Sequence, residues 1–65
     1  MSERVRKAIK ESVFTFGEIA MILDTPRTTF FKHLKDDSLT TKELFEIITI
    51  LGLSDEEIIK LIKGE

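Results

Sequence analysis

Apolar residues recur with helical spacing in five short segments of this chain. Residues three or four positions apart lie on one face of a helix, so this spacing marks the side that packs against a core. The first segment should begin at Ser2 or Glu3 and end near Ser12. Segment by segment, the residues with this spacing are Val5, Ala8 and Ile9; Ile19, Ala20 and Leu23; Phe30, His33 and Leu34; Leu44, Ile47, Ile48 and Leu51; and Ile58, Ile59, Leu61 and Ile62. The pattern predicts an all-α chain.

Three of the segments begin with an S/T-x-x-E capping box, at Thr15, Thr40 and Ser54. In this motif the hydroxyl accepts a hydrogen bond from the N–H three residues on, and the glutamate accepts one from the first residue of the motif. Gly52 and Gly64 suit the left-handed residue that ends a helix. These signals predict where the second, fourth and fifth helices begin and where the last two end.

A sharp break divides residues 16–35 into two helices. Pro26 disfavours helical geometry at the residue before it, and its fixed φ suits the first position of a new helix. We therefore expect the chain to leave the first helix near Asp24, and we expect Thr25 to cap the second helix. Two short helices joined by a tight turn are the helix-turn-helix pattern.

Residues 16–35 resemble the helix-turn-helix of the lambda-repressor-like and Cro-like phage regulators. Ala20 stands at the small-residue position where the two helices cross. The residues at the apolar core positions of the motif are Ile19, Leu23 and Phe30. Residues 25–30 resemble the turn and the start of the recognition helix, and the resemblance continues over residues 44–53. It implies a compact five-helix lambda-repressor-like domain over residues 1–65.

The chain departs from this family at three positions. Phe16 stands where Gln is common, Asp24 where Gly is preferred in the turn, and His33 where an apolar or aromatic residue is preferred. We interpret His33 as a histidine packed at the edge of the core, rather than as a ligand or a base. The resemblance implies a small phage-type transcription regulator that binds operator DNA through the second helix of the motif.

That second helix has an outward face suited to the major groove of DNA. At 100° per residue its apolar residues point one way, and a mostly polar set points the other way. Arg27 can fork to guanine, Thr28 can bond to a base edge or a phosphate, and Phe31 can meet a thymine methyl group. The resemblance implies the same three base-reading positions. We assign phosphate contacts to Thr15, Lys32, Lys35 and Arg4.

Apolar residues outside the core faces favour a second function. Met21 and Ile22 make the second helix apolar nearly all round, and such a helix is normally buried on more than one side. The alternative is therefore a helix-turn-helix protein-binding module, similar to an antirepressor, that docks on another regulator. We also expect a homodimer through the fifth helix, with Ile59 or Leu61 exposed in the monomer, because two half-sites strengthen DNA binding.

Charge favours DNA, and composition offers nothing for catalysis. The net charge is −2, but residues 1–35 hold seven Lys/Arg against four Asp/Glu, whereas residues 36–65 hold three against eight. The basic half contains the motif, as a DNA-binding face requires. One His, no Cys and no Gly-rich phosphate loop leave no site for catalysis, a metal, a cofactor or a small molecule. Without Cys, a signal peptide or a long apolar run, we expect a cytoplasmic protein without membrane contact.

Overall fold

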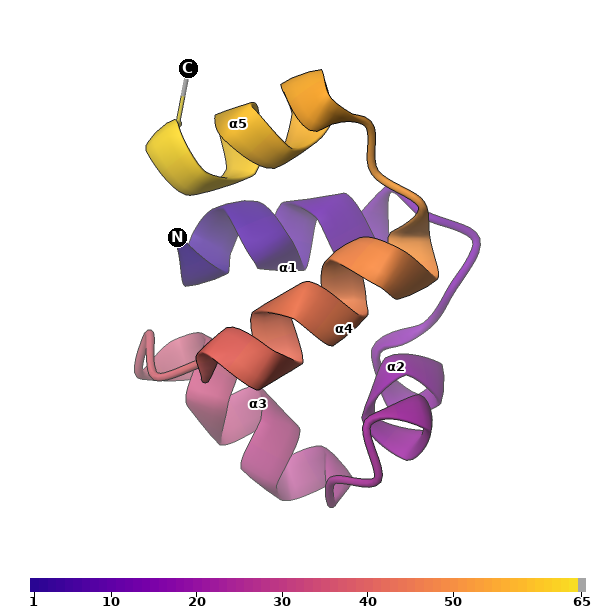
Figure 1. Cartoon of the computed structure of the whole chain (residues 1–65). Coiled ribbons are helices and arrows are strands. Elements are labelled where there is room, and N and C mark those ends of the chain that lie inside the picture. The colour runs from indigo at the N-terminus through magenta and orange to yellow at the C-terminus, as the bar shows by residue number, and fades with distance from the viewer. Residues whose placement is uncertain (65) are drawn as a thin grey trace.

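All five predicted segments form helices in the computed structural model, which describes residues 1–64 (Figure 1). The helices are α1 (Ser2–Lys10), α2 (Phe16–Ile22), α3 (Arg27–Lys35), α4 (Thr41–Leu51) and α5 (Asp55–Lys63). The prediction of an all-α chain is thus confirmed over these residues. The first helix ends two residues before the predicted Ser12, because the Ser12 hydroxyl donates to the carbonyl of Ile9 at 2.6 Å and turns the chain away.

The three predicted capping boxes are all present. The Thr15 hydroxyl accepts from the N–H of Glu18 at 3.1 Å, and the Glu18 carboxylate accepts from the N–H of Thr15 at 2.8 Å. The same reciprocal pairs begin α4 and α5. Gly52 and Gly64 follow α4 and α5 with φ values of 63° and 77°, so both are left-handed terminators as predicted.

The prediction that Thr25 caps α3 is wrong. Pro26 occupies the N-cap position, and α3 has no side-chain cap. Thr25 instead closes α2, since its N–H donates to the carbonyl of Ala20 at 3.0 Å and its hydroxyl donates to the carbonyl of Leu23 at 3.3 Å. The last carbonyls of α2 lack intrahelical partners, so they offer acceptors within reach of Thr25.

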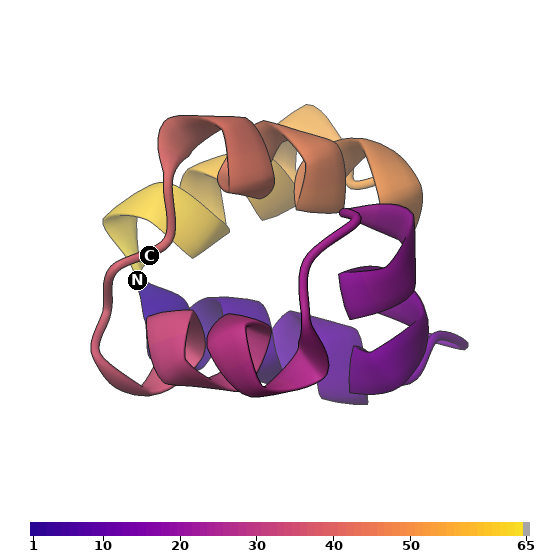
Figure 2. The same cartoon turned by 90° about the horizontal axis from the view of Figure 1, so that it is seen from below.

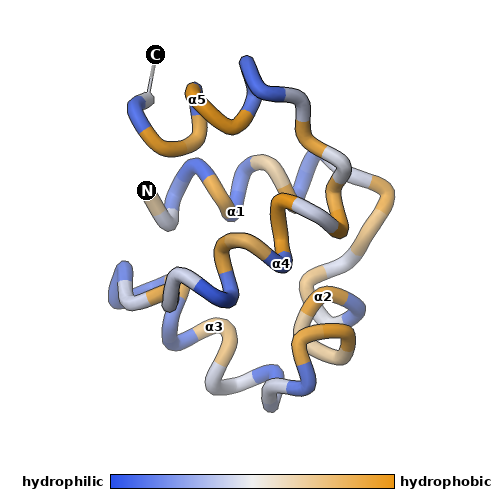
Figure 3. Tube along the Cα trace, viewed as in Figure 1, coloured by the Kyte–Doolittle hydropathy of each residue, from blue (hydrophilic) through white to orange (hydrophobic). Residues whose placement is uncertain are grey.

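A small core draws on every helix. Its buried apolar residues are Val5, Ile9, Ile19, Ala20, Phe30, Leu34, Ile47 and Leu61. Figure 2 shows α1 and α3 side by side, with α4 and α5 across the core from them. Figure 3 shows hydrophobic stretches in α2, α4 and α5, whereas the turn between α2 and α3 is hydrophilic. This arrangement leaves the outer sides of α1 and α3 on one face of the molecule.

Two polar contacts fix α1 against distant parts of the chain. The Arg4 side chain donates through Nε to the carbonyl of Leu61 at 2.7 Å and through Nη2 to that of Ile62 at 3.1 Å. At the start of α1, the N–H of Ser2 donates to Oδ1 of Asp37 at 3.0 Å. These contacts join α1 to the end of α5 and to the loop after α3. None of the helices in the described part of the chain has the length and apolar character needed to cross a membrane.

Candidate nucleic-acid interface

The turn between α2 and α3 depends on one left-handed residue. Asp24 has a φ of 55°, and Asp is among the few residues other than glycine that adopt this geometry readily. This is the position where the resemblance in sequence leads one to expect Gly, and Asp24 adopts the left-handed conformation there. Pro26 follows with a φ of −56° and directs the chain into α3. The short turn holds the start of α3 close to α2.

The outward side of α3 carries the five residues that the sequence pattern placed there. Arg27, Thr28, Phe31, Lys32 and Lys35 are exposed, whereas the inward residues of this helix form part of the core. No Lys or Arg of this set has a carboxylate within the 4.0 Å ion-pair distance among residues 1–64. The structure thus places them together on one accessible face, and their roles toward DNA stay predictions.

Arg27 lies against the first turn of α2. A Cβ atom built on Gly17 would lie 3.5 Å from Nε of Arg27 and 3.7 Å from its Cζ. Because Gly17 has no side chain, the guanidinium can rest beside the α2 backbone. Thr15 and Met21 border the same hollow as Arg27. This contact positions the predicted base-reading guanidinium where α2 and α3 both begin.

Phe31 is less isolated than its outward position suggests. Phe31 is 41% exposed, and its ring centroid lies 5.4 Å from that of Phe16 and 6.5 Å from that of Phe30. Such tilted aromatic pairs are favourable arrangements. Phe16, the departure from the family's Gln, therefore partly covers Phe31. Sequence reasoning missed this pairing because the two residues lie on different helices.

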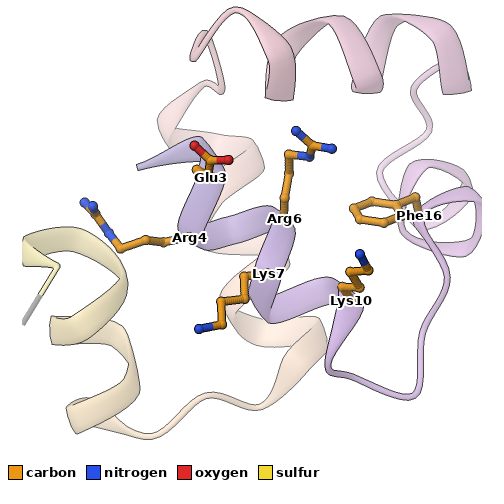
Figure 4. A pocket seen from close by; sticks show the side chains of 6 residues that line it. All are labelled: Glu3, Arg4, Arg6, Lys7, Lys10 and Phe16. Carbon is orange, nitrogen blue, oxygen red and sulfur yellow. The ribbon is translucent and has the colours of Figure 1, made fainter.

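The predicted phosphate contacts differ in availability. Lys32 and Lys35 are exposed and have no ion pair in the described chain. The Thr15 hydroxyl already accepts the capping hydrogen bond, but its proton stays available for donation to a phosphate. Arg4 does not fit the prediction, because its guanidinium serves the last carbonyls of α5 and extends away from Phe16 (Figure 4). We therefore exclude Arg4 from the candidate interface.

His33 connects α3 with the start of α4. Its Nδ1 lies 3.0 Å from Oε2 and 3.1 Å from Oε1 of Glu43, which also accepts from the N–H of Thr40 at 3.0 Å. Burial is the largest single influence on Glu43 and favours its neutral form. The N–H of Thr40 and the His33 ring together outweigh it, so the pKa of Glu43 lies below its ordinary value of 4.5. His33 is thus half-buried at the edge of the core, as predicted, and its side chain contacts Glu43.

Two further cations, outside the set predicted above to contact phosphates, lie beside this face. Arg6 and Lys10 of α1 line a shallow groove together with Phe16 (Figure 4). In the sequence they are two of several basic residues on α1, and nothing local separates them from Lys7. Arg4 and Lys7 line the same groove, and Arg6 and Lys10 differ from them in extending toward the Phe16 side of α1 (Figure 4). The i, i+4 spacing of Arg6 and Lys10 was the one available signal.

The predicted protein-contact residues divide into exposed and buried positions. Met21, Ile22 and Ile59 are exposed. Leu61 is only 5% exposed, so the prediction that it lies on a free surface is wrong. Residues two positions apart in a helix lie about 200° apart around its axis. Leu61 therefore points to the core while Ile59 points outward. A homodimer through α5 stays a prediction, in which Ile59 contacts the second copy and Leu61 does not.

A scan of protein-family models and searches of curated proteins and of solved structures found no match to this chain. Among residues 1–64, no group of three or more His, Asp or Glu side chains is arranged to hold a metal ion.

Proposed function

We propose that this chain is a small transcription regulator that binds operator DNA through α3, with its helices arranged as in the lambda-repressor-like regulators. One observation carries the proposal: unpaired cations and hydrogen-bonding side chains share the outward face of α3 in a chain whose net charge is −2. An exposed helix with this composition matches the dimensions and the polarity of the major groove.

The residues of this face divide into two roles. Arg27, at the start of α3, donates two parallel hydrogen bonds to O6 and N7 of a guanine, while Thr28 and Phe31 contact neighbouring base edges. Lys32 and Lys35 lie further along the helix and neutralise phosphates, which fixes the register of α3 without reading sequence. Thr15 adds a hydroxyl donor at the start of α2. A cytoplasmic homodimer on two half-sites completes the proposal.

The first prediction separates base reading from phosphate binding. Arg27→Ala should cost about 1–3 kcal/mol of binding free energy and relax the preference at one base pair. Lys32→Ala should weaken binding to all duplexes similarly and reduce the salt dependence. Gel shifts with a duplex selected from random sequences, and with that duplex changed at one base pair at a time, measure both effects. An Arg27→Ala variant that weakens selected and random DNA equally would contradict the base-reading role.

A second candidate function is supported by an apolar hollow between α2 and α4. Ile22 and Phe45, which are 52% and 65% exposed, border a hollow of about 250 Å³ together with Ile50. Exposed apolar residues of this size are typical anchors of protein interfaces. The alternative is a protein-binding module, similar to an antirepressor, that docks on another regulator through this surface.

A further inference from the structure

A groove on the outer side of α1 lies next to the aromatic pair of Phe16 and Phe31. Its volume is about 410 Å³, and Arg6, Lys10 and Phe16 are among the residues that line it. Figure 4 shows the Arg6 and Lys10 side chains extending toward the Phe16 side of α1, whereas Lys7 extends away. Side chains at positions i and i+4 have Cβ atoms about 5–6 Å apart. The two charges therefore act on one small area.

Neither of these cations is neutralised within the described chain. The ion pairs of residues 1–64 join the amino group of Met1 to Asp37 and His33 to Glu43. The protein has 12 acidic and 10 basic residues, so acidic partners are available in its composition. Glu3, the acidic residue of the groove, lies at the end away from Phe16 (Figure 4). Positive charge is thus left unpaired at the end nearest the aromatic pair.

The groove is continuous with the outward face of α3. The Phe16 ring borders the groove and packs against Phe31, 5.4 Å away between centroids. Arg6 also borders a second hollow together with Lys35, at the other end of α3. Because α1 and α3 run side by side (Figure 2), a duplex whose major groove receives α3 brings one flanking backbone toward α1.

We propose that Arg6 and Lys10 bind phosphates of the DNA backbone that borders the groove occupied by α3. The inference rests on the proposed function and extends it to a second element, α1. Both side chains are charged donors of phosphate hydrogen bonds, and they hold the domain on the duplex without reading bases. Phe16 lies between them and Phe31, so the contact surface runs unbroken from α1 to α3.

Duplex DNA fits this surface better than an acidic peptide does. Arg27, Lys32 and Lys35 continue the positive charge of Arg6 and Lys10 over a second helix. The DNA backbone presents a regular line of negative charges that can meet such an extended set, and it releases a counterion at each neutralised phosphate. An acidic peptide lacks this condensed counterion layer, so its binding should depend less steeply on salt.

Two charge-matched double variants test the proposal. The first combines Arg6→Gln with Lys10→Gln. The control combines Lys60→Gln with Lys63→Gln, two lysines of the last turn of α5 that do not line the groove. Glutamine keeps a high helix propensity, so both variants should retain their helices. Circular dichroism and urea unfolding check the fold. Fluorescence anisotropy then measures binding to a duplex selected from random sequences by the wild-type protein.

We expect the slope of log K against log salt to decrease by about 1.8 in the Arg6, Lys10 variant, because each neutralised phosphate contributes about 0.9. Between about 50 and 200 mM salt, the wild type should therefore lose about 12-fold more affinity than this variant. The Lys60, Lys63 variant should keep the wild-type slope. The ratio of affinities for selected and random duplexes should stay unchanged, because phosphate contacts carry no sequence information.

The outcomes separate this inference from the proposed function. Equal slopes for the two double variants, with binding through α3 retained, would overturn the inference and leave the proposed function standing. A wild-type protein that binds no duplex at low salt would overturn both. If the Arg6, Lys10 variant does not fold, Lys10→Gln alone should decrease the slope by about 0.9, and an unchanged slope would overturn the inference.

Discussion

The Ser2 hydroxyl is buried at the first position of α1. Its side chain helps to lower the pKa of Asp37, but no atom of residues 1–64 meets the hydroxyl with hydrogen-bond geometry. A buried polar atom without a partner loses its bonds to water and gains nothing in return. The N–H of the same residue is satisfied by Asp37. The side chain of Ser2 is thus a local cost at the start of α1, a helix without a side-chain cap.

Ser2→Ala should raise the free energy of unfolding by about 1 kcal/mol, because it removes an unsatisfied hydroxyl and leaves the N–H contact to Asp37 in place. Ser54→Ala is the matched control. It removes the hydroxyl that caps α5, and should lower the free energy of unfolding by about 1 kcal/mol. Urea unfolding followed by circular dichroism measures both. A loss of stability in Ser2→Ala would mean that this hydroxyl has a partner in solution.

Single-residue predictions succeeded where the partner was near in sequence. Thr15 and Glu18 are three positions apart, so their pairing follows from the motif alone. Thr25 was misplaced because two helix ends compete for it, and only the folded turn shows that α2 provides the acceptors. Arg4 binds carbonyls at positions 61 and 62, a partnership that no local pattern contains.

At the scale of elements, α3 depends on α4 for its position. The contact between His33 and Glu43 joins the two helices, and the same carboxylate completes the capping box of α4. The folded state lowers the pKa of Glu43, so ionised Glu43 stabilises the fold. This stability is fully present above the unfolded pKa of about 4.5 and is lost as the pH falls through the lower folded value.

Glu43→Gln tests this link, because glutamine keeps the capping hydrogen bond but never ionises. The variant should be less stable than the wild type by about 1 kcal/mol above pH 5, and the difference should vanish at lower pH as Glu43 becomes protonated. Urea unfolding across this pH range measures the difference. When both proteins also carry His33→Ala, the difference in stability between them should be smaller, because the contact with His33 is absent from both. A difference that does not change with pH would contradict the role of the charge.

The helices themselves were largely predictable, and their arrangement was not. Capping boxes and terminal glycines set the start of α2 and both ends of α4 and α5. The end of α1 was missed because the side chain of Ser12 competes for a backbone carbonyl. The pairing of Phe16 with Phe31, and the placement of Arg6 and Lys10 beside it, depend on how α1, α2 and α3 pack together.

At the scale of the whole molecule, two surfaces compete as the functional one. One combines the outward face of α3 with the basic side of α1. The other is the apolar hollow between α2 and α4, where Ile22 and Phe45 are exposed. Met21 borders a hollow with Arg27 and does not line the apolar hollow, so a charge placed there would disturb the surface around α3. Ile22 and Phe45 are the cleaner probes of the apolar surface.

Two double variants decide between these surfaces. Ile22→Asp with Phe45→Asp places charges in the apolar hollow. This variant should abolish the capture of a regulator partner, because burying such anchors is worth roughly 1.5–3 kcal/mol each. It should leave DNA binding unchanged. Lys32→Ala with Lys35→Ala should weaken DNA binding and leave the capture of a regulator partner unchanged. It should also reduce the slope of log K against log salt by about 1.8. We expect the DNA function to be lost only in the second variant. A wild-type protein that retards no duplex at low salt, yet binds a purified regulator through Ile22 and Phe45, would establish the protein-binding function instead.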